Sequence, residues 1–229
     1  MGKDWTVTEE GRCRLCISPR EWDLLEMPYH FHRFLTEIED VLKETTTVQQ
    51  SDCLPALRGL VRKLVVNAYW LRAFSERAQR SHPINNVTNI NLPQISLPFV
   101  STPDESQGTA FFNLYDEIGY PLTVQLEMLA PGAMSSIHCH GTWGIVAVLQ
   151  GQEKNTLWKR QPEPKFPNKI VCVGEKILQY GDIISFVPTA IHRIEAISVE
   201  PLVTFNLYGE TDRRQRFEFD PMTHQSKHY

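Results

Sequence analysis

The stretch that decides the fold is GAMSSIHCHGTWGIVAVLQG, residues 132–151, which has a glycine at each end. It places His138 and His140 two residues apart, just before the apolar run IVAVL. Side chains alternate between the two faces of a strand, so both imidazoles point to one face and Cys139 points to the other. The stretch therefore predicts a strand of a β-barrel that presents two imidazoles to one metal ion.

A second stretch, YGDIISFVPTAIH over residues 180–192, supplies a third imidazole. A glycine-aspartate turn, an apolar strand and a proline lead into His192. The two stretches resemble the two sequence motifs of cupin barrels. The glutamate that usually adds a fourth ligand falls on Gly144 here, so the expected metal ligands are His138, His140 and His192.

The second half of the chain has the pattern of short strands. Apolar and polar residues alternate over 122–129 and 203–208, and residues 145–149 are continuously apolar. Many short strands separated by glycines are typical of a sandwich or small barrel. We therefore expect a mainly β fold, a cupin barrel of the double-stranded β-helix or jelly-roll type, with a C-terminal tail, over residues 109–229.

The first third of the chain is different. Apolar residues between 57 and 71 recur at helical spacing, after a helix start at Asp52 and Pro55. A further helical stretch covers 29–44, whereas residues 1–17 are polar and indicate no element. We expect a helical N-terminal arm over 1–80 and an irregular connector, rich in proline and asparagine, over 81–108.

The lack of a carboxylate ligand bears on the chemistry. Two histidines and one carboxylate are the usual non-haem Fe(II) ligand set. Three imidazoles leave the charge of the ion uncompensated, so the metal favours an anionic donor such as a thiolate. Zinc tolerates the same three ligands, so ligand type alone leaves iron and zinc open.

At a finer level the sequence resembles the cysteine dioxygenase family. The resemblance is carried by the segments SSIHCH over 135–140, LQG over 149–151, HRIE over 192–195, EP over 200–201 and FDPMT over 219–223. It implies a cupin barrel, Fe(II) held by the three histidines, and oxidation of a thiol to a sulfinate with O₂. It also implies hydrogen-bonding residues beside the metal, which match Thr204, Asn206 and Tyr208 here. Tyr208 is the expected hydrogen-bond donor or acid.

One position departs from the family in the expected substrate pocket. Phe112 stands where the family has an arginine that binds the substrate carboxylate, and Trp143 and Gly144 are the other expected pocket residues. Without a cation, a carboxylate loses its hydration on entering the pocket. Either another arginine takes this role, with Arg72, Arg193 and Arg213 as candidates, or the substrate is not cysteine itself.

Composition narrows the class of protein. The 229 residues carry a net charge of -4, which gives no general attraction to nucleic acid or anionic membranes. Five cysteines without an export signal indicate a reducing, cytoplasmic setting. The expected partners are a small thiol and O₂. The alternatives are a three-histidine iron dioxygenase that acts on a carbon substrate such as a dicarbonyl, and a non-catalytic cupin that binds a small ligand.

Overall fold

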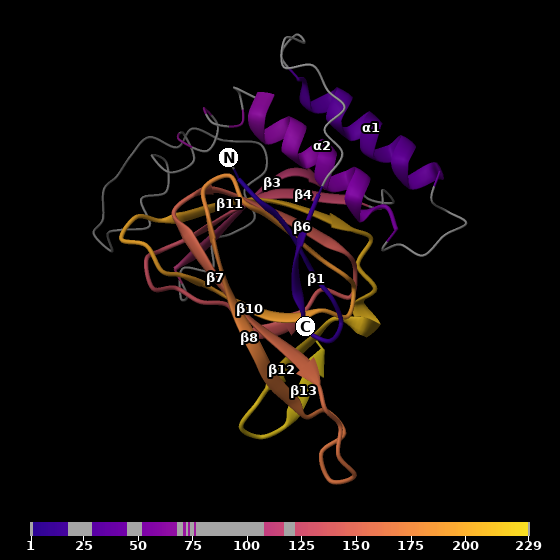
Figure 1. Cartoon of the computed structure of the whole chain (residues 1–229), viewed down its shortest axis with the longest axis vertical. Coiled ribbons are helices and arrows are strands. Elements are labelled where there is room, and N and C mark those ends of the chain that lie inside the picture. The colour runs from indigo at the N-terminus through magenta and orange to yellow at the C-terminus, as the bar shows by residue number, and fades with distance from the viewer. Residues whose placement is uncertain are drawn as a thin grey trace.

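The computed structural model describes residues 2–17, 29–44, 52–67, 108–116 and 122–228, together with Leu71, Ala73 and Glu76. Two β-sheets face each other and enclose the interior of a barrel, and two helices cover one sheet from outside (Figure 1). Residues 18–28 of the predicted helical arm, and the predicted connector up to residue 107, lie outside the described residues.

The larger sheet has seven strands, in the order β2-β1-β9-β6-β11-β4-β3. Their bounds are β1 Asp4–Val7, β2 Cys13–Cys16, β3 Thr109–Asp116, β4 Leu122–Leu129, β6 Gly144–Gln150, β9 Ile183–Phe186 and β11 Leu202–Gly209. The smaller sheet has six strands, in the order β13-β12-β5-β10-β7-β8. Their bounds are β5 Ile137–Cys139, β7 Gln152–Arg160, β8 Ile170–Gln179, β10 Ile191–Ala196, β12 Phe217–Asp220 and β13 Gln225–His228.

The burial pattern of β4 confirms the strand predicted over residues 122–129. Its even-numbered residues from Leu122 to Met128 are buried, and its odd-numbered residues up to Glu127 are less so. The apolar face packs under the helices, while Thr123, Gln125 and Glu127 line a cavity inside the barrel. The polar face of this strand therefore points inward, which is possible because the helices bury the other face.

The two helices, α1 Phe31–Glu44 and α2 Leu54–Asn67, share a hydrophobic core with the larger sheet. Phe34 of α1 is fully buried, and its ring centroid lies 5.9 Å from that of Phe205 on β11. Leu57 and Leu64 of α2 are buried in the same core. Burial of one such side chain contributes roughly 1.5–3 kcal/mol, so the helices are held to the barrel mainly by apolar contacts.

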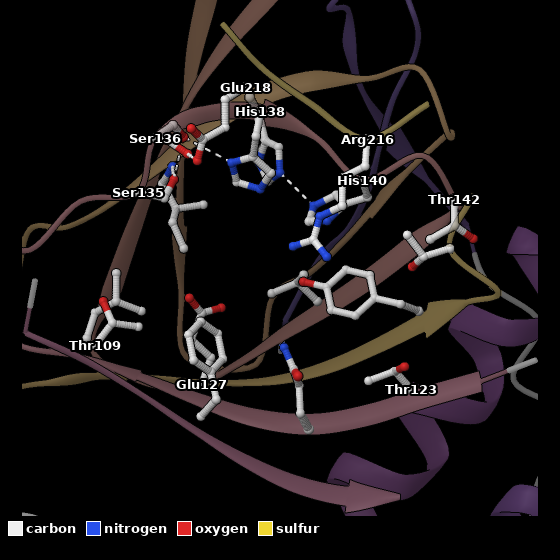
Figure 2. A pocket seen from close by; sticks show the side chains of 18 of the residues that line it. Thr109, Thr123, Glu127, Ser135, Ser136, His138, His140, Thr142, Arg216 and Glu218 are labelled. Atoms are coloured by element: carbon white, nitrogen blue, oxygen red, sulfur yellow. Dashed lines mark hydrogen bonds between the residues drawn. The ribbon is translucent and has the colours of Figure 1, made fainter. Parts of the chain in front are cut away.

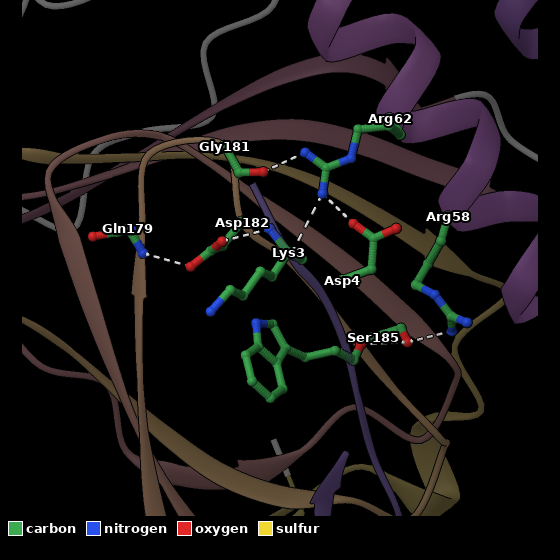
Figure 3. A network of polar contacts seen from close by, with 9 residues as sticks. Lys3, Asp4, Arg58, Arg62, Gln179, Gly181, Asp182 and Ser185 are labelled. Carbon is green, nitrogen blue, oxygen red and sulfur yellow. Dashed lines mark hydrogen bonds and ion pairs between the residues drawn. The ribbon is translucent and has the colours of Figure 1, made fainter. Parts of the chain in front are cut away.

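The N-terminal segment differs from the sequence expectation. Residues 4–16, which fall within the predicted helical arm, form the β1–β2 hairpin, and β1 pairs in parallel with β9. Arg62 of α2 binds the carboxylate of Asp4 and the carbonyl oxygen of Gly181 (Figure 3). Two strands of four residues each show too little apolar periodicity to be recognised. Their place in the sheet depends on contacts with distant residues.

The architecture is a mainly β cupin barrel with helices on the outer face of one sheet, as the sequence predicted. β3 begins at Thr109, but β1 and β2 from the N-terminal segment belong to the same sheet. No helix in the described parts of the chain is long and apolar enough to cross a membrane.

Candidate metal centre

Three histidines converge on the inner face of the smaller sheet. His138 on β5 lies directly opposite His192 on the neighbouring strand β10, and His140 follows the last residue of β5. One ring nitrogen from each histidine falls within 4.8 Å of the others. In the described parts of the chain, this is the single cluster of three or more histidine, cysteine or acidic side chains that could hold a metal ion.

The orientation of two of these imidazoles is set by hydrogen bonds. Nδ1 of His138 lies 3.0 Å from the carbonyl oxygen of Ser136, and Nδ1 of His192 lies 2.9 Å from Oδ1 of Asn155. Protonation of Nδ1 satisfies both acceptors, so Nε2 is the nitrogen of each ring that would bind a metal. Burial is the main cause that lowers the pKa of all three histidines, so the imidazoles are neutral, as metal ligands must be.

The spacing of the ring nitrogens fits one metal ion. Nε2 of His140 and Nε2 of His192 lie 2.9 Å apart. Two nitrogens at about 2.1 Å from one ion, at right angles to each other, lie about 3 Å apart. The spacing of this pair therefore suits two ligands of one divalent ion, and His138 is the third donor of the cluster.

At Gly144, the position of the missing glutamate, the packing leaves no room for a side chain. Gly144 on β6 lies opposite Tyr208 on β11, and a Cβ atom at residue 144 would approach two carbons of the tyrosine ring to 2.9 Å. The same ring lies over the metal centre, with its centroid 4.7 Å from that of His140. A side chain at residue 144 therefore requires Tyr208 to move.

The three histidines open onto a cavity of about 400 Å³. Figure 2 shows His138 and Glu127 on opposite sides of this cavity, with Arg216 extending into it beside His140. Other polar residues on the wall are Thr123, Gln125, Glu153, Tyr208 and Glu218. The cavity can hold a small polar molecule beside the metal centre.

No protein-family model and no curated protein matches the chain. Among solved structures, it is similar to a DMSP lyase, with 19% identity and a TM-score of 0.35 over 44% of this chain and 47% of the other. It is similar to an RmlC-like cupin from Shewanella frigidimarina, with 15% identity and a TM-score of 0.37 over 52% and 96%. For an oxalate oxidase the identity is 14% and the TM-score 0.37, over 56% and 64%. The chain spans about half the length of the first of these, and such similarities carry no conclusion about its activity.

The residues predicted beside the metal face the barrel interior, but they differ in their contacts. Tyr208 lines the cavity, whereas Thr204 and Asn206 are fully buried behind its wall. Asn206 donates a hydrogen bond of 2.9 Å to Oε2 of Glu127. Asn206 is therefore placed to act on the cavity through Glu127.

The predicted pocket residues need a correction. Phe112 is buried in the core beneath the helices, and Phe111 lines the cavity in its place. Successive residues of a strand face opposite sides, so an alignment displaced by one residue selects the wrong side chain. Trp143 is likewise a core residue, and Gly144 contributes to the site through its contact with Tyr208.

The cavity also has an arginine, Arg216, that was not among the candidates from the sequence. Arg216 precedes β12, and its charge is among the causes that lower the pKa of His138 and His140. Of the arginines proposed before, Arg193 and Arg213 do not line the cavity, and Arg72 lies outside the described residues. The signal in the sequence was the arginine run at 213–216, but its face could not be assigned without the fold.

Glu127 and Glu153 were also missed as site residues. Burial raises the pKa of each carboxyl to about 7, and for Glu127 the charge of Glu153 acts in the same direction. Oε1 of Glu153 accepts a hydrogen bond of 2.6 Å from Nδ2 of Asn155, which in turn contacts His192. One carboxyl group is thus linked to the metal centre through a single amide.

Proposed function

We propose that this protein is an iron-dependent dioxygenase that oxidises a small thiol to a sulfinate. The observation that carries the proposal is a set of three neutral imidazoles, without a carboxylate among them, on the wall of a cavity that also contains a cation and a tyrosine hydroxyl. Uncharged ligands leave the full charge of a divalent ion available to an anionic donor such as a thiolate. The sequence resemblance to thiol dioxygenases supports the same chemistry.

His138, His140 and His192 would hold Fe(II), which when bound supplies the redox chemistry that O₂ requires. The overall reaction is RSH + O₂ → RSO₂H: the carbon–sulfur bond is kept, and both oxygen atoms are transferred to sulfur. Iron is the metal proposed because zinc has no redox chemistry and would not support this reaction.

The surrounding residues bind and orient the substrate. The ring of Tyr208 packs on His140, and its hydroxyl can donate a hydrogen bond to sulfur or oxygen in the cavity. Arg216 provides a guanidinium at the same wall, which can bind the negative charge of a thiolate or of the sulfinate product. Both groups favour anionic species next to the metal centre.

The structure changes the argument about cysteine. The expectation that cysteine is a poor substrate rested on Phe112 as a pocket residue, and Phe112 lies in the core instead. Arg216 supplies a cation in the cavity, so a carboxylate need not enter without a partner. Cysteine therefore belongs in the set of thiols to be tested.

The cavity wall also bears on the dicarbonyl alternative. An apolar pocket would support that alternative, whereas the wall has two carboxyl groups, an arginine and several hydroxyl and amide groups. A polar wall favours a polar, hydrogen-bonding substrate, so the thiol hypothesis is preferred.

The test is an O₂-uptake screen on protein loaded with Fe(II). Cysteine, other small thiols and dicarbonyls are compared, and the product is identified by mass spectrometry. We expect uptake with at least one thiol and a product heavier by two oxygen atoms, and no uptake with His140→Ala. Uptake with dicarbonyls alone, or with none of these compounds on iron-loaded protein, contradicts the proposal.

A further inference from the structure

Two carboxyl groups from opposite sheets face the same end of the cavity. Glu127 lies on β4 of the larger sheet and Glu153 on β7 of the smaller one, and both line the cavity. They are close enough that the charge of Glu153 contributes to the raised pKa of Glu127. Figure 2 shows Glu127 across the cavity from His138, so this carboxyl group lies away from the metal centre.

In the described part of the chain, neither carboxyl group has a recorded ion pair with a cation. Each accepts one hydrogen bond from an amide, at 2.9 Å from Asn206 and at 2.6 Å from Asn155. These amides hold the carboxyl groups in place but bring no positive charge. Burial of acidic groups without a compensating cation is unfavourable unless a ligand or a proton neutralises them.

Buried acceptor atoms at this end lack a partner. Glu153 is 1% exposed, and its Oε2 has no hydrogen bond to any described residue. The same holds for Oδ1 of Asn206, a residue that is fully buried. The second oxygen of Glu127 is a further acceptor on the cavity wall. This end of the cavity therefore offers acceptors in excess of donors, and two of them carry charge.

We propose that Glu127 and Glu153 form a subsite for the protonated primary amino group of a ligand, with Asn206 holding Glu127 in place from behind the cavity wall. An ammonium group has three N–H donors and no acceptor, which suits a site lined by two carboxyl groups and their negative charge. A hard divalent cation fits less well, because it requires about six oxygen ligands, and each carboxyl group here already accepts an amide hydrogen bond. The subsite does not depend on the nature of the group that binds the metal.

The ionisation of the pair agrees with this assignment. With the pKa of both carboxyl groups raised to about 7, the empty site retains protons at neutral pH. An ammonium stabilises the ionised form, so binding releases protons and becomes tighter as pH rises through 7. The other titratable groups on the cavity wall are His138, His140, His192, Tyr208, Arg216 and Glu218.

The subsite does not rest on the proposed thiol oxidation. It is therefore tested with ligands that contain no sulfur, on protein loaded with zinc, which fills the three-histidine site without redox chemistry. A failure of this test leaves the oxidation proposal intact, and the reverse also holds.

The experiment compares the binding of propylamine and 1-propanol by calorimetry at pH 7.5. We expect propylamine to bind at least tenfold more tightly, with proton release that is detected by repeating the titration in buffers of different ionisation enthalpy. Glu127→Gln and Glu153→Gln should reduce the preference for the amine at least fivefold. Glu195→Gln is the matched control, because Glu195 lies on β10 but pairs with Lys154 rather than lining the cavity.

Equal affinity for the amine and the alcohol overturns the proposal, as does a preference that Glu127→Gln leaves unchanged. Competition by Mg²⁺ at concentrations that match the amine also overturns it, in favour of an inorganic cation site. Glu153→Gln could disturb zinc binding through Asn155 and His192. The recorded contacts of Glu127 do not link it to a histidine, so Glu127→Gln alone decides the outcome if the other variant loses zinc.

Discussion

Gly144 and Tyr208 are paired across the β6–β11 ladder so closely that the glycine hydrogen faces the edge of the tyrosine ring. Any larger side chain at residue 144 brings its Cβ to 2.9 Å from the ring, well inside normal contact. The absence of a carboxylate ligand and the placement of Tyr208 over His140 are therefore parts of one arrangement. This arrangement leads to the first prediction.

Gly144→Ala should destabilise the protein and displace Tyr208. Overpacking of this kind costs about 1–3 kcal/mol of unfolding free energy. The measurement is urea denaturation together with thiol turnover, and both should fall. Gly174→Ala is the control, since a Cβ there meets nothing within 4 Å and the variant should keep wild-type stability. A Gly144→Ala protein as stable and active as the wild type contradicts the packing argument.

His140→Ala should abolish binding of Fe(II) while the fold remains. Removal of one of three ligands leaves two imidazoles, which cannot hold the ion in a defined geometry. The measurement is iron content after reconstitution, with circular dichroism to verify the fold. Cys139→Ala serves as the control, because Cys139 packs against Ile137 and Phe219 on the other face of the sheet and should leave iron content unchanged. Stoichiometric iron in His140→Ala means that the ligands are assigned wrongly.

Tyr208 should carry no covalent link to cysteine. Some members of the resembled family join this tyrosine to a cysteine at the position of Gly144, which has no sulfur. Cys139 faces away from the cavity, and Cys172 is exposed on β8. Peptide mass spectrometry of iron-loaded protein after turnover should recover Tyr208 unmodified. A peptide that joins Tyr208 to any cysteine would disprove the placement of these side chains.

Asp4→Asn should destabilise the barrel by about 3 kcal/mol, because it leaves the guanidinium of Arg62 buried without its counter-ion. Both side chains of this pair are almost completely buried, at 1% and 6% exposure. The loss is measured as a shift of the urea midpoint at constant m-value. Glu39→Gln is the comparison, since its pair with Lys43 is exposed and its loss costs less than about 0.5 kcal/mol. Equal effects of the two substitutions would mean that β1 is not held by Arg62.

Without an amine ligand, the ionisation of Glu127 and Glu153 should reduce stability as pH rises. The folded-state pKa of each is raised to about 7, from an ordinary value of 4.5, so the folded protein binds more protons than the unfolded chain between these values. The unfolding free energy therefore decreases with pH in this window, by at most about 1.4 kcal/mol per pH unit for each group.

The contribution of Glu127 to this pH dependence of the unfolding free energy is measured by comparison with Glu127→Gln. The variant lacks one of the two carboxyl groups and should lose less stability between pH 5 and about 7. The comparison is needed because the three histidines, whose pKa values are lowered, act with the opposite sign. The test is a series of urea titrations of zinc-loaded wild type and variant over this range. Identical pH slopes for the two proteins would show that Glu127 is ionised throughout.

The sequence alone determined the features that depend on local pattern. The alternation over 122–129 and 203–208 predicted β4 and β11, and the helical spacing after Asp52 predicted α2. His138, His140 and His192 were recognised because two of them share the face of one strand and the third ends a similar motif. These patterns can be recognised in the sequence because backbone geometry sets the periods at which side chains of strands and helices share a face.

Tertiary structure decided which side chains share the cavity. Arg216, Glu127 and Glu153 come from three different strands or their ends, and only the closure of the barrel brings them around one cavity. The face on which Phe112 lies depends on strand register, in which a shift of one residue moves every side chain to the other face. The β1–β2 hairpin likewise depends on pairing with β9 and on the contact between Asp4 and Arg62. Thr6 and its partner Ser185 on β9 are 179 residues apart along the chain, and Asp4 and Arg62 are 58 residues apart. Long-range contacts of this kind leave no periodic signal in the sequence, so the cavity and its charges could be known only from the fold.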